Sequence, residues 1–211
     1  MENSNNQEKK KKELKIILLG DAGVGKSSII LRYYQNKFNE NGVPTFGTSY
    51  VIKEVEKKEN IFKLNIWDTS GQERYRSVTK LFVQGASIVI LVFSVDRRES
   101  FEILDFWYKE VLKICQGEEN FVLGVLGNKS DLFALDLAET IPEEEAIKYA
   151  KEKNAYFKFV SAKEDYKGIE TYFNSLLDKC IERNIGTELE SSFKIRRKST
   201  KKEKKPKASC C

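Results

Sequence analysis

Short apolar runs recur along the chain between Leu14 and Ile181, separated by polar stretches of varying length. Several runs are rich in β-branched residues and too short for helices, which is typical of strands. The runs that begin at Ile88 and Phe121 are almost continuously apolar, as expected for strands covered on both faces of a sheet. The pattern predicts strands at residues 14–19, 50–55, 61–67, 88–95, 121–126 and 156–160.

Apolar residues at helical spacing lie between most of these runs. They predict helices at 27–38, 100–115 and 169–181, and a further helix that opens at Pro142. The polar turn at 57–60 joins two of the strands into an antiparallel hairpin at a sheet edge. The expected fold class is therefore α/β: a six-stranded, mostly parallel sheet with one antiparallel edge strand and helices on both faces. Ligands of such a sheet bind beyond the carboxyl ends of its strands.

The two ends of the chain differ from its middle. We expect residues 1–13 to form a disordered basic tail, residues 14–183 a single domain, and residues 184–211 a second disordered tail. The formal net charge of +5 belongs to this second tail, because residues 194–207 contain nine Lys or Arg and one Glu.

Composition narrows the possible chemistry. Histidine is absent, so imidazole is available neither as a general base nor as a zinc ligand. The longest apolar run, residues 88–93, is too short to span a bilayer, and the first residues lack the apolar core of a secretory signal. These features lead us to expect a cytoplasmic protein.

A phosphate-binding signature lies between the first strand and the first helix. Gly20, four further residues and then Gly25-Lys26-Ser27 match a P-loop at each fixed position. Glycines let several backbone amides face one anion, while the lysine adds charge and the serine offers a hydroxyl to Mg2+. A glycine turn without a ligand is the alternative, and the strand–loop–helix context disfavours it. The expected nucleotide-binding residues here are Asp21, Ala22, Gly23, Val24, Gly25, Lys26, Ser27 and Ser28.

Polar segments also follow three later strands. Asp68 can hold the Mg2+ shell through water, and Gly71 lets an amide approach the terminal phosphate, although this pair alone would be a common turn. The segment from Asn128 through Lys129 to Asp131 is either a polar turn with a helix cap or a guanine site. In the second case the Asp131 carboxylate accepts from guanine donors that adenine lacks, which gives strong discrimination. Ser161, Ala162 and Lys163 fit a loop whose Ala162 amide reaches guanine O6.

With these motifs in this order, residues 14–183 resemble a Ras-superfamily small GTPase, and hence the P-loop GTPase fold. Within that superfamily the chain resembles the Rab branch. The residues that carry this likeness are KLNIWDTSGQERYRS at 63–77, Gly47 after Thr45-Phe46, and the terminal Cys210-Cys211.

The resemblance implies further roles. Thr45 would bind Mg2+ together with Ser27 and Asp68, Phe38 would pack against the guanine, and Gln72 would orient the attacking water. GTP or GDP would be the ligand and Mg2+ the cofactor. Hydrolysis would then be a matter of positioning and charge stabilisation, often with an arginine supplied by a partner.

The chain departs from the family pattern at several positions, which leaves the intrinsic hydrolysis rate open. Ala22 replaces a glycine of Ras proteins, Ser70 replaces an alanine, and Gly42 replaces an aromatic residue. An effector-binding surface is expected at Tyr50, Trp67 and Phe82, with Phe46 beside it. Ordinary packing of these aromatic residues is an equally good interpretation.

The tail resembles a Rab site for double geranylgeranylation at Cys210 and Cys211, since two lipids give stable anchoring where one does not. Basic residues at 194–207 would add attraction to an anionic leaflet. The family implies an exchange factor, a GTPase-activating protein, effectors, a GDP-dissociation inhibitor and a Rab escort protein as partners. We expect a monomeric domain that cycles between cytosol and an intracellular membrane and binds no nucleic acid. A GTP-bound scaffold with negligible hydrolysis is the alternative.

Overall fold

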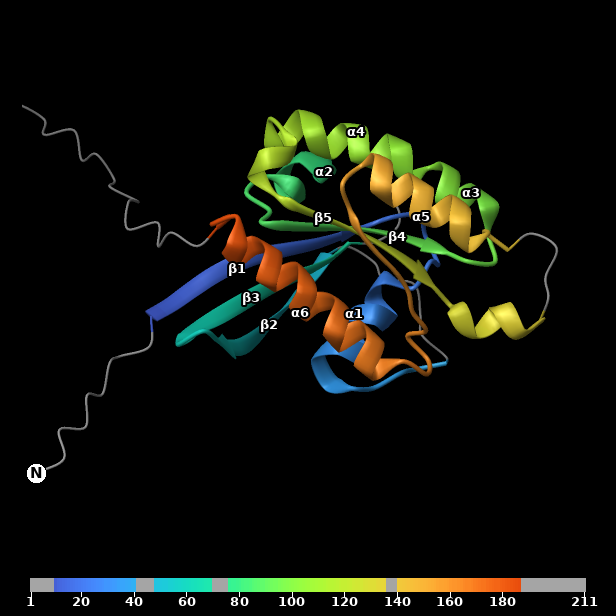
Figure 1. Ribbon diagram of the computed structural model, residues 1–211, viewed down its shortest axis with the longest axis horizontal. Helices are drawn as coiled ribbons and strands as arrows, with labels where there is room; N and C mark the ends of the chain where they lie inside the picture. Colours follow the sequence, from blue (N-terminus) through green and yellow to red (C-terminus); the bar gives the residue numbers. More distant parts are fainter. Residues whose placement is uncertain (1–9, 41–47, 70–75, 136–139, 187–211) are drawn as a thin grey trace, which may run out of the picture.

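The computed structural model describes residues 10–40, 48–69, 76–135 and 140–186, which form one six-stranded sheet with helices on both faces (Figure 1). The strand order is β2-β3-β1-β4-β5-β6. Among these six strands of the described residues, β2 and β3 alone pair antiparallel, at one edge, as the sequence predicted. The strands are β1 (Lys10–Leu19), β2 (Thr48–Lys57), β3 (Asn60–Thr69), β4 (Ile88–Ser94), β5 (Val122–Asn128) and β6 (Tyr156–Phe159).

The helices divide between the two faces of the sheet. One apolar core lies under α1 and α6, and a second lies under α2, α3, α4 and α5. The helices are α1 (Lys26–Gln35), α2 (Arg76–Val83), α3 (Arg98–Glu102), α4 (Leu104–Cys115), α5 (Glu143–Glu152) and α6 (Tyr166–Glu182), with short 3-10 turns η1 (Glu118–Asn120) and η2 (Ser130–Leu135). Within the described ranges, no helix has the length and apolar content that crossing a membrane requires.

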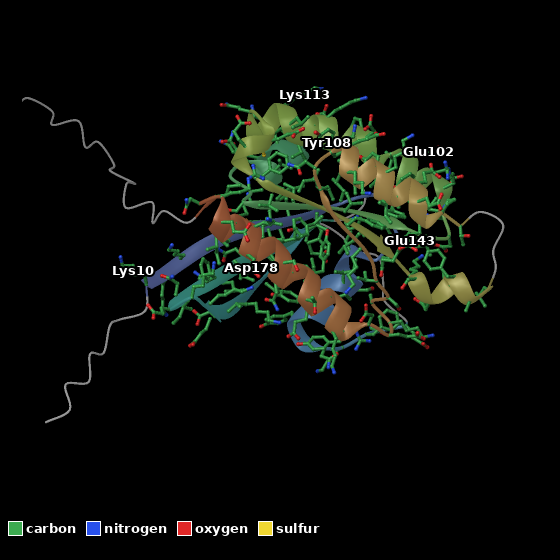
Figure 2. The ribbon with its side chains drawn as sticks, viewed as in Figure 1. Lys10, Glu102, Tyr108, Lys113, Glu143 and Asp178 are labelled. Carbon is green, nitrogen blue, oxygen red and sulfur yellow. The ribbon has the colours of Figure 1, made fainter. Side chains whose placement is uncertain are left out.

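Period-two alternation explains why the sheet needs both layers. Along β1, Leu14, Ile16 and Leu18 enter the core under α1 and α6, while Ile17 and Leu19 enter the opposite core. Successive side chains of a strand point to opposite faces, so a wholly apolar strand is stable only when helices cover both faces. The charged residues lie outside: Figure 2 shows Glu102, Lys113 and Glu143 on the outer sides of their helices, where all are exposed.

Strand β1 is longer than the sequence predicted. It begins at Lys10 rather than Leu14, so the basic residues assigned to a tail belong partly to the sheet. Lys10 pairs with Asn60 in the β1–β3 register, and the Glu13 carboxylate accepts from the Lys63 ammonium at 2.8 Å. The backbone ladder with β3 thus continues the strand past the last apolar residue, where hydropathy carries no signal.

The other end of the domain also extends beyond the expected boundary at Arg183. Ile185 is buried, and its amide donates to the Cys180 carbonyl at 2.9 Å. A Cβ atom on Gly186 would lie 2.9 Å from Leu14 and 2.2 Å from Ser87, so this glycine packs against β1 and the residue before β4. A single buried isoleucine after a helix end has no periodicity that would reveal it.

Two helical segments also differ from expectation. The helix predicted at 100–115 consists of α3 and α4, which meet at Ile103 (φ −71°, ψ −11°). Helix α2 was not predicted: its eight residues, Arg76–Val83, are too few for a clear helical period. Pro142 lies at the N-cap of α5 rather than inside its first turn.

Helix α6 is tied to the sheet by a buried tyrosine. The Tyr172 hydroxyl lies 3.1 Å from the Val125 carbonyl oxygen and 3.0 Å from that of Tyr156. Burial raises the pKa of Tyr172, so the hydroxyl stays protonated and acts as a donor. We expect Tyr172→Phe to lower the free energy of unfolding by about 1 kcal/mol, measured by urea denaturation.

Tyr166→Phe is the matched control on the same helix. Its hydroxyl donates to Glu170 at 2.7 Å near the surface, where water replaces the lost bond, and a change within about 0.5 kcal/mol is expected. Equal losses for both variants would contradict the role given to Tyr172.

Candidate nucleotide-binding site

The predicted P-loop joins the carboxyl end of β1 to the start of α1. Two of its glycines are required by close contacts. A Cβ on Gly20 (φ +147°) would lie 2.0 Å from the Val92 carbonyl oxygen, and one on Gly25 (φ +94°) would lie 2.2 Å from the Asn128 side-chain nitrogen. The loop can therefore lie this close to β4 and to the Asn128 side chain only with glycine at these positions.

Lys26 lies inside the loop that precedes it. Its ammonium donates to the Gly20 carbonyl at 2.7 Å and to the Asp21 carbonyl at 3.1 Å, and the residue is only 4% exposed. Gly25, the N-cap of α1, supplies no side-chain cap. A helix N-terminus of this kind, with a lysine beside it, favours binding of an anion.

Asn128 joins the P-loop to the segments predicted to bind the base. From the end of β5, its side-chain NH2 donates to the Val24 carbonyl at 2.8 Å, and its side-chain oxygen accepts from the Ala162 amide at 3.1 Å. The Ser161 hydroxyl in turn donates to the Asp131 carboxylate at 2.6 Å. Motifs that lie far apart in the sequence thus form one continuous site at the carboxyl edge of the sheet.

The remaining base-loop residues take part in ion pairs. Lys129, with a positive φ of 64°, lies 3.7 Å from the Asp96 carboxylate, and Lys163 lies 3.2 Å from that of Glu40. Phe38 is half-buried and packs against the core under α1 and α6.

Comparison with known proteins agrees with this geometry. A family model described as "Ras family" matches residues 15–182. Human Ras-related protein Rab-22A is 36% identical over 205 residues, which cover 95% of this chain and 98% of the relative. Rat Rab-31 is 40% identical over 152 residues (72% and 75%), and rat Rab-9A is 35% identical over 201 residues (93% and 96%). The chain belongs to the Rab subfamily of Ras-family small GTPases. It is accordingly a guanine-nucleotide-binding protein.

Asp68, for which the sequence predicts a role in Mg2+ binding, lies near the end of β3. Asp68 is 7% exposed near that end, and the next residue, Thr69, donates its hydroxyl to the Leu18 carbonyl at 2.8 Å. This bond holds the Asp68 segment beside the strand that enters the P-loop. A carboxylate there and the Ser27 hydroxyl at the start of α1 are hard oxygen ligands, which fit Mg2+. Thr45, Gly71 and Gln72, the other residues expected at the terminal phosphate, lie outside the described residues.

The aromatic residues expected on a Rab effector surface form one continuous row. The Tyr50 and Trp67 rings stack at 5.3 Å between centroids, and the Trp67 and Phe82 rings lie 5.8 Å apart. Tyr50 is 57% exposed, and Leu81, the residue before Phe82, is 72% exposed. Phe46 lies outside the described residues. Packing and exposure therefore coexist in this row, so the two interpretations of the sequence are not exclusive.

Basic residues that sequence reasoning missed support the site. Arg32 on α1 donates to the Ala162 carbonyl at 2.7 Å and to the Lys163 carbonyl at 2.5 Å. These two bonds attach the loop at residues 161–163 to α1. Lys15 on β1 donates to the Gln84 carbonyl at 2.9 Å, after the end of α2, and lies 5.2 Å from the Trp67 ring. Arg97 reaches the P-loop. These contacts join distant segments, so spacing in the sequence gave no signal for them.

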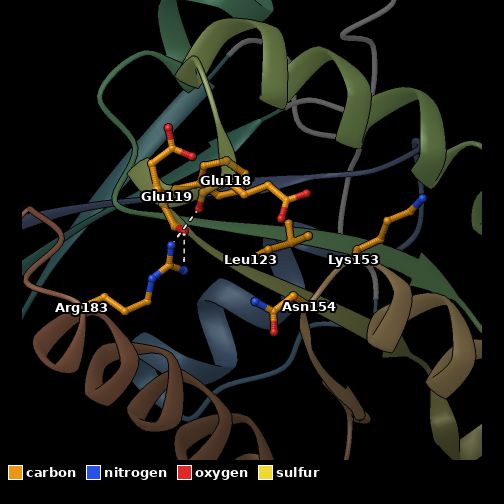
Figure 3. A pocket seen from close by; sticks show the side chains of 7 residues that line it. Glu118, Glu119, Leu123, Lys153, Asn154 and Arg183 are labelled. Atoms are coloured by element: carbon orange, nitrogen blue, oxygen red, sulfur yellow. Dashed lines mark hydrogen bonds between the residues drawn. The ribbon is translucent and has the colours of Figure 1, made fainter.

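A cavity of about 290 Å³ lies near the amino-terminal ends of β5 and β6, away from this site (Figure 3). The Arg183 guanidinium donates to the Glu118 carbonyl at 2.8 Å and to the Phe121 carbonyl at 3.0 Å. Lys153, also at its wall, pairs with Asp105 at 3.2 Å. These contacts fasten α6 and α5 to neighbouring elements, which is a structural task.

The bridging role of Asn128 can be tested by Asn128→Ala. The change leaves the Val24 carbonyl and the Ala162 amide without this partner in a buried place, so we expect about 2–4 kcal/mol lower free energy of unfolding and faster release of GDP. Urea denaturation and displacement of a fluorescent GDP measure the two effects.

Asn120→Ala is the control, because exposed Asn120 also donates its side-chain amide to a backbone carbonyl, that of Cys115 at 2.8 Å. Its unfolding free energy should change by less than about 0.5–1 kcal/mol and its GDP release should stay as in the wild type. A wild-type rate of release from Asn128→Ala would disprove the bridge.

Proposed function

We propose that this chain is a Mg2+-dependent Rab switch that binds GTP, hydrolyses it slowly and recruits effectors of vesicle trafficking to a membrane. The observation that carries the proposal is the bridge through Asn128, which makes the phosphate loop and the base loops a single rigid site. The base and the phosphates of one nucleotide would then be bound by loops that are joined to each other.

In this proposal the loop around Lys26 holds the phosphates, and its ammonium moves from the loop carbonyls to the outer phosphates. The Asp131 carboxylate accepts from the N1 and N2 donors of guanine, held in place by the Ser161 hydroxyl. Adenine presents no such donors, and it would leave the carboxylate unpaired. The Ala162 amide donates here to the Asn128 side-chain oxygen, so it would exchange that bond to donate to guanine O6.

For hydrolysis, Ser27, Asp68 and Thr45 would hold Mg2+, which neutralises charge on the phosphates when bound. Gln72 orients the attacking water, and an activating partner supplies an arginine. Loss of the terminal phosphate releases the segments around Thr45 and residues 71–76. The result is a binding surface present in one nucleotide state only.

That surface includes the aromatic row of Tyr50, Trp67 and Phe82, to which Phe46 would add. Aromatic side chains with an exposed edge are typical anchors of protein interfaces. Family membership supports an exchange factor, a GTPase-activating protein and a GDP-dissociation inhibitor as further partners, with a Rab escort protein for lipidation. Lipids on Cys210 and Cys211, together with the basic residues at 194–207, would provide the membrane anchor.

A second candidate is a GTP-bound scaffold with negligible hydrolysis. Ala22, Ser70 and Gly42 motivate it. Ser70 and Gly42 replace residues usual around the terminal phosphate, and Ala22 stands where Ras proteins keep a glycine but Rab proteins often carry a small side chain. The two functions differ in one measurable quantity, the rate of the chemical step.

Single-turnover release of phosphate from preloaded GTP separates them. Gln72→Leu removes the group that orients the water, so we expect a rate about 10 to 100 times lower than that of the wild type, with GDP release unchanged. A wild type no faster than Gln72→Leu would favour the scaffold.

Membrane anchoring is tested by localisation of the tagged protein in cells that prenylate Rab proteins. Replacing both Cys210 and Cys211 with serine should abolish the membrane signal, and replacing either one should leave weak, reversible binding, because one lipid gives marginal affinity. Cys115→Ser is the control. It changes a half-buried cysteine at the end of α4 and should keep the membrane signal. Membrane binding by the double variant would rule out this anchor.

A further inference from the structure

Arg97 contacts the P-loop from outside, although it belongs to none of the nucleotide motifs. It precedes α3, at the carboxyl end of β4. One guanidinium nitrogen, Nη2, donates to the Ala22 carbonyl at 2.8 Å and to the Asp21 carboxylate at 3.1 Å. A Cβ added to Gly23 would lie 3.7 Å from the other terminal nitrogen, so the guanidinium also lies against this glycine.

The backbone of Arg97 is held in place by buried serines. Its amide donates to the Ser94 carbonyl at 3.1 Å, and its carbonyl accepts from the Ser100 hydroxyl at 2.6 Å. Ser94 and Ser100 are both 0% exposed. The guanidinium therefore extends from a fixed point at the end of β4.

The contact with the Ala22 carbonyl determines where the next amide points. In a trans peptide the C=O and the following N–H point in opposite directions. A carbonyl turned toward Arg97 thus directs the Gly23 N–H to the other side of the loop. The side-chain amide of Asn128 acts in the same way on the Val24 carbonyl, and so on the Gly25 N–H.

We propose that Arg97 is a positioning residue of the phosphate site, which holds the Gly23 amide toward the nucleotide phosphates and thereby slows nucleotide release. The ion pair with Asp21 contributes little alone, because the two side chains are 37% and 24% exposed and water screens them. The bond to the Ala22 carbonyl carries most of the effect. It is charge-assisted, and it fixes a peptide plane.

The neighbouring residue offers a matched control. Arg98 donates to the two oxygens of Glu145 at 2.7 and 2.6 Å, and to Glu102 at 3.4 Å. Arg98→Met thus removes the same charge one position along, together with a bidentate ion pair on the outer side of α3. Among the bonds described for Arg98, none reaches the P-loop.

Release of fluorescent GDP, chased with excess GDP, tests the proposal on the full chain. We expect Arg97→Met to release GDP about ten times faster than the wild type, the loss typical of one charge-assisted hydrogen bond. Arg97→Lys, which keeps the charge without the planar fork, should give an intermediate rate. Arg98→Met should stay within about twofold of the wild type. Wild-type release from Arg97→Met, or equal acceleration in Arg98→Met, would overturn the proposal.

A second readout distinguishes positioning from general loosening. The 31P NMR signals of bound GDP report the hydrogen bonds made to its phosphates, so Arg97→Met should shift them and Arg98→Met should not. Unshifted signals in an Arg97→Met protein that releases GDP faster would assign the effect to stability and contradict positioning. Should Arg97→Met fail to fold, the same comparison is made with Arg97→Lys.

The role of Arg97 rests on the proposed function, because Arg97 acts on its phosphate site. The measurements nevertheless distinguish failure of the proposed function from failure of the role of Arg97. A wild type that does not retain GDP would refute the proposed function. A wild type that retains GDP, with Arg97→Met retaining it equally well, would refute the role of Arg97 alone.

Discussion

The arrangement of the site depends on the two hydrogen bonds that the side-chain amide of Asn128 makes. One buried group serves a carbonyl of the phosphate loop and an amide of the base loop, and both bonds lie where water does not compete. A buried polar group is stabilising only when its partners are in place. Binding at either loop is therefore expected to stiffen the other, so the nucleotide is held as a whole rather than as separate parts.

Around this bridge, three basic side chains donate to backbone carbonyls of the loops. Arg32 holds the base loop, Arg97 holds the phosphate loop, and Lys15 holds the end of α2 beneath the aromatic row. Lys15 comes from β1, Arg32 from α1, and Arg97 from the N-cap of α3. Burial lowers the pKa of Lys15, whose side-chain nitrogen lies 5.2 Å from the centre of the Trp67 ring. The loops thus inherit their shape from the core beneath them.

Much of the fold was readable from the sequence because its signals are local. The apolar run of β1 and the motif from Gly20 to Ser27 are each complete within a few residues of the chain, so pattern and chemistry agree there. The first residues of β1 were missed because the ladder with β3, not hydropathy, makes them a strand. Arg97 was missed because its partners lie far away in the sequence and become neighbours only once β1 and β4 are paired.

The end of α6 has a consequence for orientation at a bilayer. Ile185 is buried, and Gly186 lies beside Leu14 and Ser87, toward the amino-terminal ends of β1 and β4. The nucleotide loops lie at the carboxyl-terminal edge of the same strands. A lipid tether attached after Gly186 would therefore join the domain at the pole away from the nucleotide loops. Partners that read the nucleotide could then approach without displacing lipid.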